Sequence, residues 1–285
     1  MTGREASVAA RIKAVAMEKG ITFQYATLLY MNEGLLRRLS GSPFRDRFVL
    51  KGGLLLQSLA ESGGRTTKDI DLLGNGIEND VENLRAVFSS IGKIEDEDAL
   101  RFDDISMNVE AIMEGADYHG IRLRVPCFLG NIRNTIQIDV GFGDAVEPPP
   151  RHMRYPLLIG GREFFILSYP LAAVVAEKFE TIIALADSSS RMKDFWDLAF
   201  ILEHFEIPEE ELHAALRATF ERRHTPRPAE PLVFSHAFVS SERALGLWSA
   251  FMKRTHLPVQ AWENALEIIK GRLAPLYKEI RNALQ

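Results

Sequence analysis

The chain has 285 residues, of which 46% are hydrophobic, and it carries a net charge of −5 with a pI near 5.9. This is enough apolar material for one large or two ordinary globular domains, and the acidic balance excludes a protein that coats nucleic acid through its overall field. A single cysteine, Cys127, excludes an internal disulfide, and the lack of any long uncharged apolar run predicts a cytoplasmic protein without a membrane partner.

The predicted elements change in kind near residue 168. Before that point, short apolar runs bounded by turn residues predict strands, with helices before and between them. These runs are RFVLKGG, KDIDLLG, ISMNVEAIM, GIRLRVPCFLG, NTIQIDVGFG and REFFILSYP. After it, apolar residues recur at helical steps in LAAVVAEKFETIIALA and KDFWDLAFILEHF, and further helices are expected after Pro208, over 238–256 and over 260–283. We therefore predict an α+β fold, with a mixed sheet and flanking helices in a domain over residues 1–168 and an α-helical domain over residues 169–285.

Two acids interrupt the second predicted strand. In an extended chain Asp69 and Asp71 project to the same face, while Ile70 and Leu72 point into the core. Two adjacent carboxylates repel each other unless a cation lies between them, and oxygen ligands of this kind suit Mg²⁺ or Mn²⁺. The alternative is structural: Asp71 caps a turn and Asp69 forms a surface salt bridge with a neighbouring Lys68 or Arg65.

The segment just upstream gives the acids a context. A short strand runs into Lys51, Gly52 and Gly53 and then into an apolar helix. Paired glycines at a strand-to-helix turn let the backbone approach a phosphate, which the free N–H groups of the helix start can bind. An ordinary tight turn is the alternative. Asp139, late in a third apolar strand, is a candidate third carboxylate that would complete a site for two metal ions.

Lys178 is the next unusual residue, because it lies on the apolar stripe of its helix between Val174 and Ile182. A buried ammonium requires an anion, either a phosphate or a carboxylate. The carboxylate alternative is a structural ion pair with Asp194, Asp197 or Glu177. Basic clusters are candidate contacts to an RNA backbone, although each also fits a solvated surface. They lie at residues 45–51, 122–124, 151–154 and 222–227.

The succession LKGGLLL, RTTKDIDLL, IQIDV, AEKFETIIALA and RMKDFWDLAFI resembles the AbiEii/AbiGii (MenT-like) nucleotidyltransferase toxins over about residues 45–205. These toxins are a branch of the DNA polymerase β-like superfamily found in type IV toxin–antitoxin systems. The resemblance implies a nucleotidyltransferase fold in which Thr67, Asp69 and Asp71 form the metal- and nucleotide-binding motif, with Lys68 inside it. It also implies that the helical domain contributes Lys178, which contacts the nucleotide phosphates, and the acid Asp194.

These observations together predict the chemistry. The expected enzyme transfers a nucleotide from an NTP to an RNA acceptor, the 3′ end of tRNA by resemblance, which blocks translation. A separately encoded antitoxin is the expected protein partner. Two alternatives stay open: a nucleotidyltransferase for a small acceptor of the aminoglycoside type, and a catalytically silent binding protein of the same fold. The predicted catalytic residues are Asp69, Asp71, Asp139, Lys178 and Asp194; the metal ligands are Asp69, Asp71 and Asp139; the nucleotide-binding residues are Lys51, Gly52, Gly53, Thr67, Lys68 and Lys178.

Overall fold

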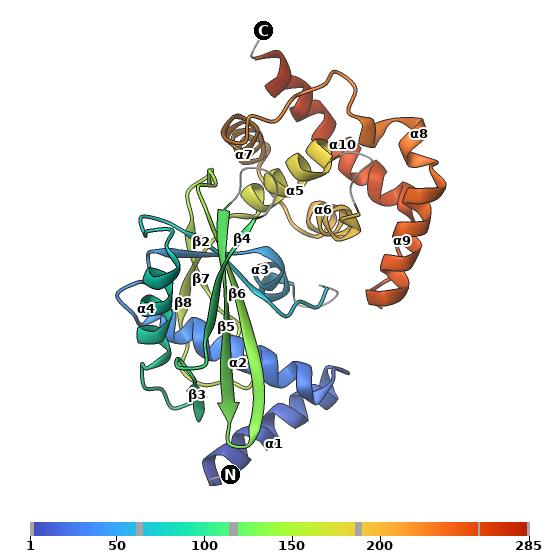
Figure 1. The fold of residues 1–285 in the computed structure, drawn as a ribbon. Helices are drawn as coiled ribbons and strands as arrows, with labels where there is room; N and C mark the ends of the chain where they lie inside the picture. Colours follow the sequence, from blue (N-terminus) through green and yellow to red (C-terminus); the bar gives the residue numbers. More distant parts are fainter. Residues whose placement is uncertain (1–2, 61–64, 114–118, 186–189, 256, 284–285) are drawn as a thin grey trace. The chain divides into compact units, whose positions relative to one another are not determined.

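A computed structural model describes residues 3–60, 65–113, 119–185, 190–255 and 257–283 (Figure 1). The chain divides into two compact units. The first comprises Met1–Leu59, Thr66–Gly143 and Arg151–Ser168, and the second comprises Ala60–Arg65, Asp144–Pro150 and Tyr169–Gln285. The chain thus passes into the second unit where strands were predicted to give way to helices. Sequence analysis did not anticipate that two short earlier segments would belong to the second unit.

The first unit contains eight strands and four helices among its described residues. The helices are α1 (Gly3–Glu18), α2 (Phe23–Ser40), α3 (Gly52–Leu59) and α4 (Val81–Gly92). The strands are β1 (Phe48–Lys51), β2 (Ile70–Gly74), β3 (Leu100–Phe102), β4 (Asn108–Met113), β5 (His119–Leu129), β6 (Ile132–Phe142), β7 (Arg151–Arg154) and β8 (Phe165–Ser168). The six predicted strands are present, while the short strands β3 and β7 were not predicted.

All eight strands form one mixed sheet in the order β3-β5-β6-β2-β1-β8-β7, with β4 pairing to β5 beside β3. The pairs β2–β6 and β1–β8 are parallel, and the other pairs are antiparallel. The longest pairing is the β5–β6 hairpin, whose register runs from Ile121 opposite Val140 to Leu129 opposite Ile132. The parallel pairing of β2 with β6 places Asp71, near the amino end of β2, beside Asp139 in β6.

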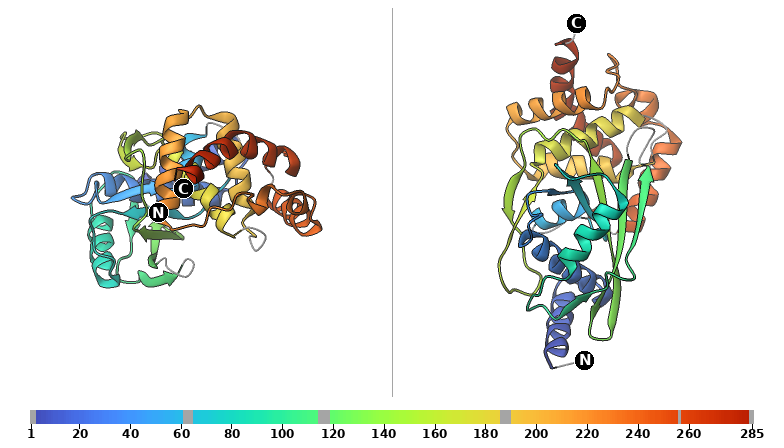
Figure 2. Two further views of the ribbon diagram at one scale, coloured as in Figure 1. Left: turned by 90° about the horizontal axis from the view of Figure 1, so that it is seen from above. Right: turned by 60° about the vertical axis from the view of Figure 1, so that its left-hand side comes forward.

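Strand alternation gives the central part of the sheet one apolar and one polar face. The apolar face comes from residues such as Ile70, Leu72, Ile138 and Leu123, all of them buried. Helices α2 and α4 pack against the sheet, with α4 contributing an apolar stripe of Leu84, Val87, Phe88 and Ile91 (Figure 1 and the right-hand view of Figure 2). Burial of this apolar area supplies the main stabilisation of the first unit.

The second unit is helical among its described residues. It contains α5 (Leu171–Leu185), α6 (Met192–His204), α7 (Glu209–Arg222), the 3₁₀ turn η2 (Leu232–Phe234), α8 (His236–Val239), α9 (Glu242–Thr255) and α10 (Trp262–Asn282), drawn from yellow to red in Figures 1 and 2. The helix predicted over 238–256 is interrupted, because the Ser241 side chain accepts a hydrogen bond from the Ala244 N–H and starts α9 anew. Aromatic rings fill the core, with Phe179 5.9 Å from Tyr277 and Phe195 5.0 Å from Trp262 between centroids. No described helix is both long and apolar enough to cross a membrane.

Candidate active site

Charged side chains occupy one level of the polar face across five adjacent strands. Lys51 on β1 is opposite Asp71 on β2, and Asp71 is opposite Asp139 on β6. Asp139 is opposite Arg122 on β5, which is opposite Glu110 on β4. Residues paired in register point to the same face, so these five form one line, here named the sheet row. Two of the predicted acids are thus neighbours, with a cationic residue on either side.

Asp69 lies just outside the sheet. Strand β2 begins at Ile70, and Asp69 is in a bend immediately before it, so the expectation that the strand itself orients both acids is wrong for Asp69. The segment that leads to this bend is hydrogen-bonded to side chains of α2. The Tyr25 hydroxyl accepts a hydrogen bond from Thr67 N at 3.1 Å, and Asn32 Nδ2 donates to Lys68 O at 3.2 Å. Thr67 and Lys68 therefore form part of a fixed support for the two acids.

The glycine turn lies directly against one of these acids. Gly52 has φ of +67°, a conformation that L side chains rarely adopt, and a Cβ added there would be 1.9 Å from Asp71 Oδ2. Only glycine therefore allows the Asp71 carboxylate to occupy this position. Gly52 and Gly53 are also the first two residues of α3, whose positive end favours negative charge. The start of α3, where a phosphate was predicted to bind, adjoins a predicted metal ligand.

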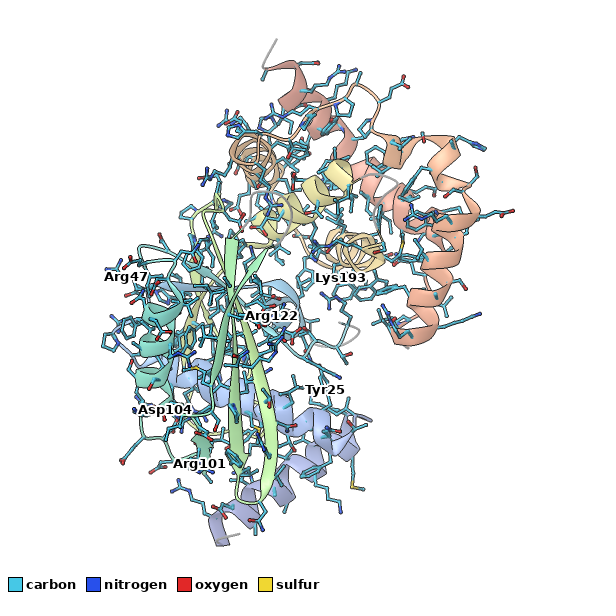
Figure 3. The ribbon with its side chains drawn as sticks, in the orientation of Figure 1. Tyr25, Arg47, Arg101, Asp104, Arg122 and Lys193 are labelled. Carbon is cyan, nitrogen blue, oxygen red and sulfur yellow. The ribbon has the colours of Figure 1, made fainter. Side chains whose placement is uncertain are left out.

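Asp139 has a different environment, because an arginine already holds its carboxylate. Arg122 donates from Nε to Asp139 Oδ1 and from Nη2 to Asp139 Oδ2, both at 2.7 Å, and Gln137 Nε2 donates to Oδ2 at 3.3 Å. The hydrogen-bonded carboxylate of Asp139 raises the pKa of Arg122, and the charges of Asp69 and Glu110 add to the effect. Figure 3 shows Arg122 on the sheet. Sequence analysis had assigned this arginine only to a basic cluster.

The residues present fit a divalent cation only in part. Within the described ranges, no three carboxylate, imidazole or thiol side chains come close enough together to hold a metal ion by themselves. Mg²⁺ is usually bound through one or two carboxylates and completes its shell with water and substrate phosphates. Asp71 beside the start of α3, with Asp69 two residues before it, matches that smaller donor set.

The second unit contains the other predicted site residues in what is here named the lysine cluster: Lys178, Asp194, Asp197, Arg65 and Arg191. Lys178 Nζ donates to Asp194 Oδ1 at 2.8 Å and to Asp197 Oδ2 at 2.7 Å. Arg65 Nε donates to Asp197 Oδ1 at 2.8 Å, and Arg191 Nε lies 2.9 Å from Asp194 Oδ2. Asp194 and Asp197, both predicted as alternative partners of Lys178, form ion pairs with it. In all, three cationic side chains contact these two carboxylates.

Burial and charge oppose each other in this cluster. Burial by itself lowers the pKa of Lys178, but the carboxylates of Asp194 and Asp197 raise it above the usual lysine value. Burial likewise favours the neutral form of Asp194, but Lys178 and Arg191 bring the pKa of Asp194 below its usual range. Lys178 and Asp194 are therefore both charged at neutral pH.

The predicted basic clusters have mixed environments. Arg223 donates to Glu180 Oε2 at 2.6 Å and to Asp144 Oδ1 at 3.1 Å, so it belongs to an ion network of the second unit. Arg124 donates to Glu110 Oε1 at 2.6 Å. Arg45 and Arg154 also pair with acids, Asp46 and Glu163, but their side chains are each 65% exposed. Only part of the predicted basic surface is therefore available to a nucleic acid.

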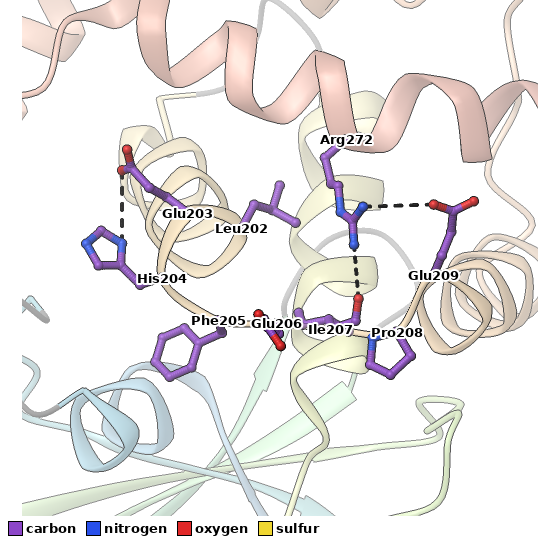
Figure 4. Close-up of a pocket in the computed structure, with 9 residues that line it drawn as sticks. All are labelled: Leu202, Glu203, His204, Phe205, Glu206, Ile207, Pro208, Glu209 and Arg272. Atoms are coloured by element: carbon purple, nitrogen blue, oxygen red, sulfur yellow. Dashed lines mark hydrogen bonds and ion pairs between the residues drawn. The ribbon is translucent and has the colours of Figure 1, made fainter.

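The second unit also has a cavity of about 760 Å³, lined by residues 202–209 and Arg272 (Figure 4). Arg272 donates to Ile207 O at 3.1 Å and lies 3.9 Å from Glu209 Oε2. The described residues of this lining include no predicted site residue. The cavity therefore does not enlarge the candidate site.

Sequence analysis missed several residues that position the site. Tyr25 and Asn32 support the acidic bend from a distant helix, and no local pattern identifies them. Asp197 was considered only as a structural partner of Lys178, although it lies one turn from Asp194 on the same helix face. The pairing of Arg122 with Asp139 depends on the register of two neighbouring strands, which the sequence does not give.

Comparison with known proteins gives a family match and two similar folds. A family model described as "Nucleotidyl transferase AbiEii toxin, Type IV TA system" matches residues 34–268. Among solved structures, the nucleotidyltransferase toxin MenT4 of Mycobacterium tuberculosis H37Rv has a TM-score of 0.58 and 18% sequence identity, with 97% of each chain covered. JHP933 from Helicobacter pylori has a TM-score of 0.50 and 14% identity, covering 92% of this chain and 96% of its own. No curated protein matches the sequence. The two solved structures share the fold, and the family match spans both units.

Proposed function

Because the chain belongs to the AbiEii nucleotidyl transferase toxin family, we propose that it transfers a nucleotide from an NTP to the 3′ end of tRNA and so blocks translation. One observation carries this proposal: the Asp71 carboxylate lies against Gly52 at the start of α3, with Asp139 beside it in the sheet row. Carboxylates for a metal ion and N–H groups for a phosphate thus adjoin each other. This is the combination that transfer from a triphosphate requires.

Asp69 and Asp71 are the proposed ligands of Mg²⁺, or of Mn²⁺ in its place. When bound, the metal ion neutralises phosphate charge and makes the α-phosphorus easier to attack. The chain's own contribution is orientation. Gly52 fixes the position of the Asp71 carboxylate, and the contacts of Tyr25 and Asn32 fix the segment that leads to Asp69.

Phosphate binding is proposed for the start of α3 and for Lys178. The backbone N–H groups at Gly52 and Gly53 would donate hydrogen bonds to the triphosphate, and Lys51 in the sheet row would add positive charge. Lys178, in the second unit, is proposed as a separate phosphate contact, in which a phosphate would replace one of its two carboxylate contacts. Asp194 orients Lys178 in this assignment.

The reaction is a substitution at phosphorus. The oxygen of the acceptor hydroxyl bonds to the α-phosphorus, the bond from that phosphorus to the bridging oxygen of the β-phosphate breaks, and pyrophosphate leaves with the hydroxyl proton lost to solvent. An RNA acceptor is favoured over a small molecule because exposed basic side chains gather at the sheet edge near residues 45–47 and β7. His152, also on β7, lies 3.6 Å from Asp46, which joins the two segments.

The test is transfer of labelled nucleotide to total tRNA, with each NTP in turn, Mg²⁺ and a denaturing gel. The wild-type protein should label tRNA, and Asp71→Asn should reduce labelling by at least about a hundredfold while retaining its fold, as expected for loss of a charge-stabilising group in an active site. Glu97→Gln, at an exposed acid of the same unit, is the matched control and should remain active. Labelling of an aminoglycoside instead of tRNA would contradict the proposed acceptor. Equal activity in Asp71→Asn would contradict the site.

A further inference from the structure

The sheet row places a fixed cation where a second metal ion would be expected. Asp139 and Asp71 are neighbours in register, so a pair of metal ions would require both carboxylates as ligands. Both oxygens of Asp139, however, already accept hydrogen bonds from Arg122 at 2.7 Å. A bidentate arginine–carboxylate pair of this length is among the strongest polar contacts in proteins. A metal ion at Asp139 would have to displace Arg122 or share the carboxylate with the guanidinium at close range.

A displaced Arg122 would have only carboxylates with other roles to pair with. Asp69, whose charge also raises the pKa of Arg122, is itself a proposed metal ligand. The two neighbours of Arg122 in register are Asp139 and Glu110, and Glu110 already accepts a hydrogen bond from Arg124 at 2.6 Å. The Arg122 side chain is 27% exposed, so a displaced guanidinium would remain partly buried close to the incoming dication. Repulsion between the two cations and loss of the ion pair both oppose this exchange.

The guanidinium also retains donors for a ligand. Arg122 uses Nε and one N–H of Nη2 on Asp139, and within the described part of the chain Nη1 makes no hydrogen bond. A planar guanidinium with unused N–H groups is suited to phosphate oxygens. Asp139 thus fixes the orientation of a cation, and that cation can bind a phosphate directly.

We propose that Asp139 is not a metal ligand but the positioning residue of Arg122, and that Arg122 supplies the positive charge that a second metal ion would otherwise supply to the NTP. This inference rests on the proposed function and narrows it to a centre with one metal ion. It replaces the prediction from sequence that Asp139 completes a second metal position.

The experiment counts metal ions. The full chain is saturated with an α,β-methylene NTP and titrated with Mn²⁺, and bound Mn²⁺ per chain is determined by electron paramagnetic resonance after correction for nucleotide alone. Wild type should bind one ion and Asp139→Asn should also bind one. Arg122→Met, which exposes the Asp139 carboxylate to metal, should gain a second, weaker ion that the double variant Arg122→Met/Asp139→Asn loses. The matched control Arg124→Met, two residues away on the same face, should bind one.

If Arg122→Met folds poorly, the variant Arg122→Lys and the number of ions bound by wild type still test the inference. Arg122→Lys keeps the charge but not the planar pair, so it should still bind one ion while its Kd for the NTP analogue rises about tenfold. Two ions in wild type, falling to one in Asp139→Asn, would overturn the inference and leave the proposed function intact. Absence of any nucleotide-dependent Mn²⁺ in wild type would overturn both.

Discussion

Two ion networks of the first unit have similar compositions but different environments. The α2 network comprises Glu33, Arg37, Arg38, Asp96 and Asp98, and the sheet row contains a similar mixture of acids and bases. In the α2 network, Asp98 is 1% exposed and receives hydrogen bonds from Arg37 at 3.1 Å and from Arg38 Nη2 at 2.9 Å. In the sheet row, Arg122 is 27% exposed and Asp139 16%. Asp98 and the two arginines of the α2 network are almost closed to solvent, although Asp96 is 18% exposed, whereas the Arg122 guanidinium of the sheet row is accessible to a ligand.

Burial and the availability of donors, more than charge type, therefore distinguish the α2 network from the proposed functional pairs of the sheet row. The α2 network connects α2 to the segment near residues 96–98. The packing there is also tight, because a Cβ added at Gly34 would be 2.4 Å from Leu100 Cδ1. The sheet row keeps a fixed pattern of charge at a partly open face. The lysine cluster shares features of both, since Asp194 and Asp197 are 3% and 0% exposed while Arg191 is 45% exposed.

The largest expected effect on stability is at Asp98. Asp98→Asn leaves Arg37 and Arg38 buried without a full counter-charge, so we expect the free energy of unfolding to fall by about 3–5 kcal/mol. Urea denaturation measures this change. The exposed Asp46, replaced by Asn, is the control and should change stability by no more than about 0.5 kcal/mol. A small effect at Asp98 would remove the distinction between the two networks.

The next effect combines stability and activity at Gly52. Gly52→Ala places a side chain at positive φ and drives a Cβ into the Asp71 carboxylate, so we expect a loss of about 1–3 kcal/mol together with loss of nucleotide-dependent Mn²⁺ binding. Gly141→Ala in β6, where an added Cβ meets nothing within 4 Å, should affect neither property. Normal Mn²⁺ binding in Gly52→Ala would show that the position of Asp71 does not matter for the metal.

Some features of the fold and of the candidate site can be predicted from the sequence, and others cannot. The acids at 69 and 71, the glycine pair and Lys178 are local patterns, and the α+β class follows from hydrophobic periodicity. The pairing of Arg122 with Asp139 and the support from Tyr25 depend on strand register and on helix packing between distant segments. Such contacts are set by the tertiary fold, and a single sequence carries no local signal for them. The start of β2 after Asp69 is another example, because strand ends depend on the neighbouring strands.

A smaller effect on stability is expected at Lys178, and the NTP affinity of the same variant should show whether the lysine cluster binds a ligand or is only structural. In Lys178→Met, Asp197 keeps Arg65 and Asp194 keeps Arg191, so we expect stability to fall by only about 1–2 kcal/mol. If Lys178 binds phosphate, the Kd for the NTP should rise at least about tenfold, which calorimetric titration measures. Lys270→Met, at an exposed lysine of α10 in the same unit, is the control. Unchanged NTP affinity with reduced stability would make the cluster structural.

The smallest effect is in the pH dependence of stability, where Asp194 and Glu33 should have opposite signs. Lys178 and Arg191 outweigh burial and lower the pKa of Asp194, so its contribution is present above the pKa of the unfolded chain and is lost as pH falls through the folded value. Burial raises the pKa of Glu33, although the Leu158 N–H and Arg37 oppose it, so its contribution is present in acid and is lost as pH rises through the folded value. Urea denaturation from pH 3 to 7 should therefore show Asp194→Asn approaching wild type in acid, and Glu33→Gln departing from it there. If the stability of both variants approached that of wild type in acid, the charged form of Glu33 would be stabilised by Arg37 as fully as that of Asp194 is by Lys178. That result would contradict the opposite signs predicted here.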